Sequence, residues 1–339
     1  MTGYERLVSV LRGEWPDRMP VLPILHTALA GLAGVPLGRY FTDANAMASV
    51  AVEGYRRFGF DGVQLSLGVT GEAEALGAAV EQPPDAAPVL RQHLLADPTR
   101  LDALRARNAI AGGRMPLFFD AVEKVAARIG HEAFVLATLR GPLLIAAQLR
   151  GIEDTLVDMV ERPEAVERVL AFTTDLATQL ARVLLPFGAH GLVLGEATCS
   201  PNFISPELYR QLVLPSHRRL VGELKRIGWP FVGLHICGNI LPILDDLIST
   251  GVDFFDVDYQ VPAAEAISRV AGRVALRGNL DPSAVLRFGT ADEVRAQTDA
   301  LCRAAHGARW IAGSGCDIPP GTPAENLAAF VDAVRSHAV

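Results

Sequence analysis

The stretch FVGLHICGN, residues 231–239, joins a short apolar run to a polar end that contains His235 and Cys237. The run Phe231–Ile236 is almost continuously apolar, which is typical of a parallel strand covered on both faces. Counting this run, eight β-rich runs alternate with long helical stretches, and the others are Met19–Leu25, Gly62–Leu67, Ala133–Leu139, Gly191–Glu196, Asp253–Asp258, Arg273–Gly278 and Arg309–Gly313. This alternation predicts an α/β fold, a single (β/α)₈ TIM barrel.

One barrel domain is expected to take up the whole chain, residues 1–339. The Pro-rich stretches Gln82–Pro88 and Ile318–Pro323 are too short for interdomain linkers and are interpreted as surface loops. A doubly wound open sheet is the alternative fold. It would normally carry a phosphate-binding glycine loop, and the sequence contains neither G-x-G-x-x-G nor G-x-x-x-x-G-K-[ST].

The composition and charge exclude several classes of protein. A net charge of −7, from 31 basic and 38 acidic residues, argues against a nucleic-acid partner. No apolar run reaches the ~18 residues of a membrane span, and the charged N-terminus does not resemble a signal peptide, so a cytoplasmic location is expected. Four cysteines are too few for a disulfide framework, which favours metal binding or catalysis for a patterned subset.

Reactive residues cluster where the predicted strands end. His235 and Cys237 are two residues apart, which on a strand places both side chains on one face. Cys316 follows the eighth strand, and active sites of barrels form at this rim. One nitrogen and two sulfurs suit zinc, and three protein ligands with one open position are typical of a catalytic zinc site. The sequence therefore predicts zinc on His235, Cys237 and Cys316.

The sequence leaves the identity of a fourth zinc ligand open. Glu196, at the end of the fourth strand, is the best candidate for a displaceable ligand, and a general base or a polar loop residue are its alternatives. Cys199 is a rival ligand, whereas Cys302 and His306 are expected to pack on an outer helix. Further candidates at the rim, for substrate or for ordinary turns, are His26, Glu72, Asp258, Asn279, Asp281 and Asp317.

At H-I-C-G-N and S-G-C-D-I-P the chain resembles the uroporphyrinogen decarboxylase superfamily. Shorter similar pieces occur along nearly the whole chain, among them Glu14–Val21, Gly71–Gly77, Gly141-Pro142, Gly278–Pro282 and Thr322–Asn326. The resemblance implies a (β/α)₈ barrel, in agreement with the strand count. It also implies one of two chemistries.

The metal-free decarboxylases of this superfamily fit the sequence poorly. They carry an arginine-rich loop, an aspartate after the second strand and a tyrosine after a Gly-Pro turn. Here Pro23–Gly34 has no arginine, Gln64–Leu67 has no aspartate, and Gln148 stands at the expected tyrosine. The zinc methyltransferase branch, which includes corrinoid:coenzyme M methyltransferases, uses a His-x-Cys…Cys zinc site that corresponds to His235, Cys237 and Cys316, with an acidic residue corresponding to Glu196.

The resemblance therefore implies methyl or alkyl transfer to or from a thiol such as coenzyme M, with zinc holding the thiolate. The methyl donor is expected to be a methylcorrinoid. The sequence has no D-x-H-x-x-G cobalamin motif, so a corrinoid would arrive on a separate protein or free in solution. Epoxide opening by a zinc thiolate, transfer to a non-thiol acceptor, a metal-free decarboxylase and a barrel with structural zinc remain as alternatives.

Overall fold

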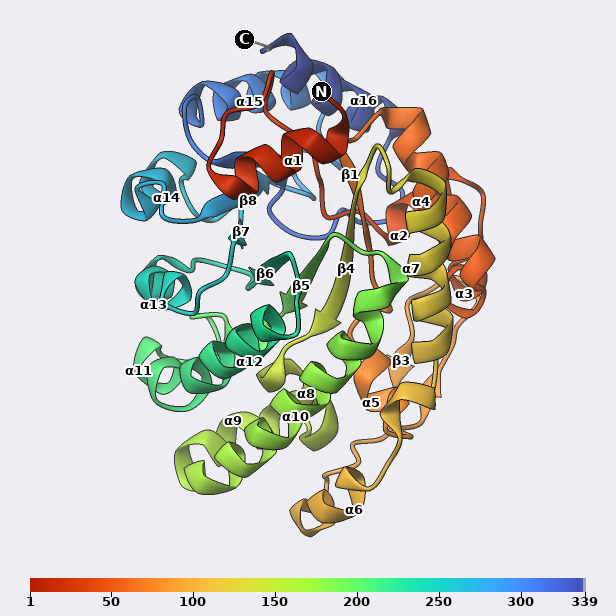
Figure 1. Cartoon of the computed structure of the whole chain (residues 1–339), viewed down its shortest axis with the longest axis vertical. Helices are drawn as coiled ribbons and strands as arrows, with labels where there is room; N and C mark the ends of the chain where they lie inside the picture. Colours follow the sequence, from red (N-terminus) through yellow and green to blue (C-terminus); the bar gives the residue numbers. More distant parts are fainter. Residues whose placement is uncertain (338–339) are drawn as a thin grey trace.

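The computed structural model describes residues 1–337. Its main sheet has seven parallel strands in the order β1-β4-β5-β6-β7-β8-β9. The sheet is curled, with the helices on its outside (Figure 1). The seven strands are β1 (Gly62–Leu65), β4 (Phe134–Arg140), β5 (Gly191–Gly195), β6 (Phe231–His235), β7 (Phe254–Val257), β8 (Ala275–Leu280) and β9 (Trp310–Ser314).

Helices connect the strands, and a small hairpin, β2 (Val80–Glu81) with β3 (Val89–Leu90), follows β1. The α-helices are α1 (Gly3–Arg12), α2 (Thr27–Leu32), α3 (Leu37–Thr42), α4 (Ala44–Phe58), α5 (Gly71–Ala75), α6 (Leu101–Arg105), α7 (Met115–Ile129), α8 (Pro142–Arg150), α9 (Ile152–Glu161), α10 (Pro163–Leu184), α11 (Pro206–Leu208), α12 (Leu214–Arg226), α13 (Leu244–Ile248), α14 (Ala263–Val270), α15 (Ala291–Ala304) and α16 (Ala324–Ser336). Short 3₁₀ turns cover Pro98–Arg100, Ala109–Ala111, Leu185–Phe187, Ala197–Cys199 and Leu241–Ile243, and a π-helical turn covers Tyr209–Val213.

Seven of the eight predicted strands are present, and the first, Met19–Leu25, is not a regular strand. It contributes one isolated parallel bridge, Val21 to Ala312. Pro20 and Pro23 have no N–H to donate, so a continuous ladder cannot form along this segment. The segment nevertheless lies between the two edge strands, because Leu22 N donates to Ala312 O at 2.9 Å and Asp61 N donates to Val21 O at 2.8 Å.

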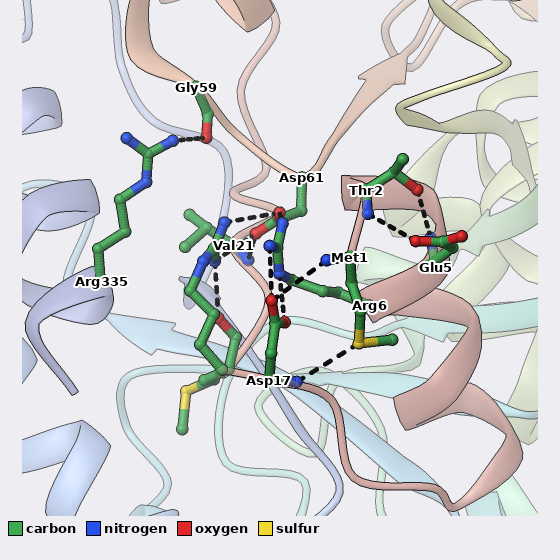
Figure 2. Close-up of polar contacts among 11 residues, drawn as sticks. Met1, Thr2, Glu5, Arg6, Asp17, Val21, Gly59, Asp61 and Arg335 are labelled. Carbon is green, nitrogen blue, oxygen red and sulfur yellow. Dashed lines mark hydrogen bonds and ion pairs between the residues drawn. The ribbon is translucent and has the colours of Figure 1, made fainter. Parts of the chain in front are cut away.

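Buried aspartate Asp61 fixes this segment to the start of β1. Its carboxylate accepts hydrogen bonds from Val21 N at 2.8 Å and from the guanidinium groups of Arg6 and Arg18 at 2.7 to 3.0 Å. Arg6 also binds Asp17, so the N-terminal residues converge on one ion-pair cluster (Figure 2). The contacts explain how a chain with two prolines in its first extended segment still brings the sheet edges together.

The N-terminal helix α1 closes one end of the sheet. Its apolar residues Leu7, Val8, Val10 and Leu11 form a buried cluster with the first residues of several strands, among them Phe134, Phe231, Phe254 and Ala275. Because the strands are parallel, their carboxyl ends all lie at the opposite end. The larger apolar core lies between the strands and the surrounding helices.

Candidate metal centre

His235, Cys237 and Cys316 meet at the carboxyl end of the sheet. His235 is the last residue of β6, Cys237 lies two residues further on, and Cys316 lies two residues after the end of β9. The His235 Nε2 to Cys237 Sγ distance is 3.3 Å, the two sulfurs are 3.7 Å apart, and Cys316 Sγ is 3.8 Å from His235 Nε2. The structure thus brings together the three residues that the sequence singled out.

The size of this triangle fits a zinc ion. With Zn–S near ~2.3 Å and Zn–N near ~2.0 Å, the edges of a tetrahedral site are roughly 3.6 to 3.8 Å. The observed edges, 3.3 to 3.8 Å, lie close to these values. All three side chains are partly exposed, and they line one cavity of about 290 Å³, so a fourth position is open to a small ligand.

A hydrogen bond orients His235 for this role. Its Nδ1 lies 2.9 Å from Asp256 Oδ2, which leaves Nε2 facing the sulfurs. Asp256 is held in turn by Arg277, whose Nε and Nη2 donate to the two carboxylate oxygens at 2.6 and 2.7 Å. A carboxylate behind a ligating histidine fixes its tautomer and increases its basicity. Sequence analysis missed both residues, because they lie inside strands β7 and β8 and carry no motif.

His235, Cys237 and Cys316 differ in how their pKa values are shifted. Burial opposes the charged form of His235, but its hydrogen bonds to Asp256 and Cys316 raise its pKa to about 9. The hydrogen bond from Cys237, together with the one from His235, lowers the pKa of Cys316 to about 5 against the effect of burial. The pKa of Cys237 is raised, first because it shares a proton with Cys316 and then because it is buried. These shifts favour a thiolate on Cys316 beside a protonated His235.

Glu196 does not join this group. Its fully buried carboxylate accepts hydrogen bonds from Leu143 N at 3.0 Å and Leu144 N at 2.8 Å, at the amino end of α8. His217 Nε2 lies 2.9 Å from its Oε1. The carboxylate therefore caps a helix whose first N–H groups have no partner within the helix. These contacts do not support the predicted role of Glu196 as a fourth zinc ligand, although the residue does line the cavity.

A second buried cluster surrounds Glu196. Its carboxylate, Cys199 Sγ and a ring nitrogen of His217 lie within 4.8 Å of one another, and all three residues are buried. Tyr209 OH lies 3.0 Å from His217 Nδ1, so the polar groups are hydrogen-bonded among themselves. Cys199 belongs to this cluster and not to the triangle. Burial raises the pKa of the Cys199 thiol well above the usual range, so this residue is a poor source of a thiolate ligand.

The other rim candidates divide into cavity residues and turn residues. His26 and Asp317 face each other across 3.1 Å and line the cavity, and the buried His26 Nε2 has no hydrogen-bond partner among the described residues. Asp258 accepts from Gly238 N and so holds the turn after Cys237. The rest have structural contacts: Glu72 accepts from Arg140 N, Asn279 donates to Val261 O, and Asp281 accepts from Ser283 N and Ala284 N. Cys302 is buried on α15, as expected.

The family model described as uroporphyrinogen decarboxylase (URO-D) matches residues 2–337. The chain belongs to this family. Among curated relatives, methylcobamide:CoM methyltransferase MtbA of Methanosarcina acetivorans is 27% identical, covering 99% of both chains. Methylated-thiol–coenzyme M methyltransferase of Methanosarcina mazei is 28% identical over 99% of this chain and 89% of its own. Uroporphyrinogen decarboxylase of a Synechococcus strain is 29% identical over 71% of this chain and 70% of its own.

A solved structure, a methyltransferase from Methanosarcina mazei, superposes with a TM-score of 0.92 over 100% of both chains at 23% identity. At this identity the likeness shows the fold of this URO-D family member. Within residues 1–337, no helix combines the length and the apolar character needed to cross a membrane.

Proposed function

We propose that this URO-D family protein is a zinc-dependent methyltransferase that moves a methyl group from a methylcorrinoid to a thiol such as coenzyme M. The observation that carries the proposal is the triangle of His235 Nε2, Cys237 Sγ and Cys316 Sγ, which has the dimensions of a zinc site with one side open to a cavity. Relatives named as methyltransferases for coenzyme M match 99% of the chain, whereas the decarboxylase matches 71% of it.

Zinc bound there would stabilise the thiolate of the acceptor at neutral pH, where a free thiol with a pKa near ~8.5 is mostly protonated. The residues around the site orient the zinc ligands. Asp256 holds the Nδ1 side of His235, so that Nε2 remains available to the metal. The substrate sulfur forms a bond to the methyl carbon as the cobalt–carbon bond breaks, the electron pair stays with cobalt, and the thiol proton leaves to solvent.

The proposed enzyme works as one domain, residues 1–339, folded as a closed (β/α)₈ barrel. Residues 20–22 take the place of the missing strand, and their hydrogen bonds to Ala312 and Asp61 support this closure. The corrinoid is supplied by a separate protein or from solution, since the sequence lacks a cobalamin motif. The cytoplasmic location remains a prediction.

Methyl transfer can be measured directly with purified protein. With methylcobalamin and 2-mercaptoethanesulfonate, we expect loss of the methylcobalamin absorbance with formation of the thioether, at about one zinc per chain. A chelator should abolish the rate, and added zinc should restore it. Transfer that survives complete removal of metal would refute the zinc mechanism. Decarboxylation of uroporphyrinogen without metal would establish the alternative function.

A further inference from the structure

An arginine side chain lies in the wall of the cavity that holds the metal ligands. Arg140 is the last residue of β4, and it lines the same 290 Å³ cavity as His235, Cys237 and Cys316. The side chain is partly buried. Burial lowers its pKa, while the carboxylate of Glu72 opposes this shift. A guanidinium nevertheless remains protonated in proteins, so the cavity contains a fixed positive charge.

The contacts of this guanidinium are neutral. Nε donates to Gly68 O at 2.9 Å, and one terminal nitrogen, Nη2, donates to Ser66 Oγ at 2.5 Å. In residues 1–337, no carboxylate lies within ion-pair distance of the guanidinium. The nearby buried acid Glu72 binds the main-chain N–H of Arg140 instead, at 2.7 Å. A partly buried cation with no ion pair, facing a cavity, can gain a charged partner from outside the chain.

The other terminal nitrogen, Nη1, makes no hydrogen bond within the described residues. It lies against Gly195, the last residue of β5, and a Cβ at position 195 would collide with it. Because Gly195 has no side chain, the guanidinium fits beside the end of β5. Gly195 also lines the cavity, which puts the unpartnered donor at its wall.

We propose that Arg140 is the anion-binding residue of the substrate site, and that the accepting thiol carries an acidic group, a sulfonate or a carboxylate. The acidic group pairs with the guanidinium while the thiol sulfur reaches the open side of the three-ligand site. Guanidinium donors form a planar fork that matches both kinds of oxyanion. This inference rests on the proposed function, and it adds a specificity residue that the metal ligands do not provide.

Competition among small thiols tests this assignment. The acceptors are 2-mercaptoethanesulfonate, 3-mercaptopropionate and the neutral 2-mercaptoethanol, with methylcobalamin as donor. We expect the native enzyme to prefer an acidic thiol over 2-mercaptoethanol by roughly 10- to 100-fold in kcat/KM, the value of one charged hydrogen-bonded pair. In Arg140→Gln the preference should fall to near one, and Arg140→Lys should restore part of it. The sulfonate and carboxylate arms show which acid is preferred.

A binding measurement separates this inference from the proposed function. Ethanesulfonate and propionate have no thiol, so the difference between their binding to the metal-free native protein and to metal-free Arg140→Gln, followed by calorimetry, isolates the contribution of Arg140. We expect binding of at least one of them to the native chain and to Arg39→Gln, an exposed control, and none to Arg140→Gln. If such binding occurs without methyl transfer to any thiol, the proposed function fails and the anion site stands. If Arg140→Gln keeps the preference among thiols, the anion site is refuted while methyl transfer remains.

Discussion

At the scale of single residues, His235 is the link between the metal centre and the interior of the fold. One ring nitrogen faces two sulfurs, and the other lies 2.9 Å from a carboxylate that is itself bound by an arginine. This arrangement gives the imidazole one orientation before any metal arrives. Preorganisation of this kind reduces the entropy that metal binding costs.

Zinc binding should release about two protons per ion near pH 7, because ligands bind zinc in their deprotonated forms. With a pKa of about 9, His235 is charged at this pH, and the raised pKa of Cys237 keeps it a thiol. Cys316, with a pKa of about 5, is already a thiolate. Affinity should therefore rise with pH, by roughly 100-fold per unit between pH 6 and 8. Calorimetry in buffers of different ionisation enthalpy measures the proton count, and a pH-independent affinity would contradict it.

Replacing one sulfur should remove zinc without unfolding the protein. Cys237 is partly exposed, so Cys237→Ala leaves little buried space empty. We expect zinc affinity to fall more than ~100-fold and methyl transfer to disappear, because two ligands remain of three. Cys302→Ala is the matched control, since that cysteine lies on α15 and does not belong to the triangle. Elemental analysis and circular dichroism check both variants. Full zinc content in Cys237→Ala would count against the site.

The sequence indicated some residues of the site and not others for identifiable reasons. His235 and Cys237 share a strand end, and Cys316 follows another, so strand prediction alone brings them together. Glu196 also follows a strand, but its partner His217 lies on α12, and no sequence pattern shows which helix end its carboxylate caps. Arg140 immediately precedes a Gly-Pro turn, and this position in the sequence does not indicate that its side chain lines the cavity.

At the scale of elements, the register between β7 and β8 supports the metal centre. Asp256 and Arg277 are direct partners in this parallel pair, and both are almost completely buried. Arg277 Nη1 also donates to Gln64 Oε1 at 2.7 Å, and Gln64 Nε2 donates to Thr138 Oγ1 at 2.9 Å. The network joins four strands beneath the site, so a polar layer inside the sheet fixes the position of His235.

Loss of Arg277 should weaken both the fold and the metal site. Arg277→Met leaves the buried Asp256 carboxylate with His235 as its remaining cationic partner, which costs about 3 kcal/mol of unfolding free energy. Zinc affinity should fall roughly 10- to 100-fold, as is usual when the partner of a ligating histidine is disturbed. Arg273→Met, at an exposed arginine just before β8 that pairs with Asp245, is the control. Denaturant unfolding and chelator competition measure the two effects. Unchanged zinc affinity in Arg277→Met would show that Arg277 does not position His235.

Strands were predicted well because parallel strands in a covered sheet are apolar runs, as at Phe231–Ile236, whose strand in the structure is Phe231–His235. The exception is Met19–Leu25, where apolar composition suggested a strand but two prolines interrupt the ladder. An apolar composition indicates that a segment is buried. Pairing with a neighbouring strand also requires backbone N–H groups at alternate positions. The polar layer around Arg277 could not be predicted, because arginine is normally a surface residue and register is a tertiary property.

For the molecule as a whole, the Asp61 cluster helps to join the two edges of the sheet, because it holds the segment that lies between them. Asp61 is 1% exposed and binds two arginines, whereas Asp17, with a side chain that is 44% exposed, binds the outer side of Arg6 (Figure 2). A buried carboxylate with paired cations is expensive to disturb, and an exposed one is not.

The two aspartates provide a matched test of closure. Asp61→Ala should lower the unfolding free energy by about 3 kcal/mol or more, because Arg6 and Arg18 lose their buried partner. Asp17→Ala should cost less than about 1 kcal/mol, as for an exposed ion pair. Urea denaturation of both variants gives the comparison. Equal, small losses would mean that the Asp61 cluster does not hold the N-terminal segment in place.

The proposed methyl transfer requires that His235, Cys237 and Cys316 hold zinc with one position open to a thiol. X-ray absorption at the zinc edge of the purified protein identifies the atoms bound to the metal. We expect two sulfur neighbours near ~2.3 Å and nitrogen or oxygen neighbours near ~2.0 Å. A third sulfur neighbour should appear when 2-mercaptoethanesulfonate is added. A zinc environment without sulfur, or one with two sulfurs that no thiol substrate alters, would contradict the proposed zinc site.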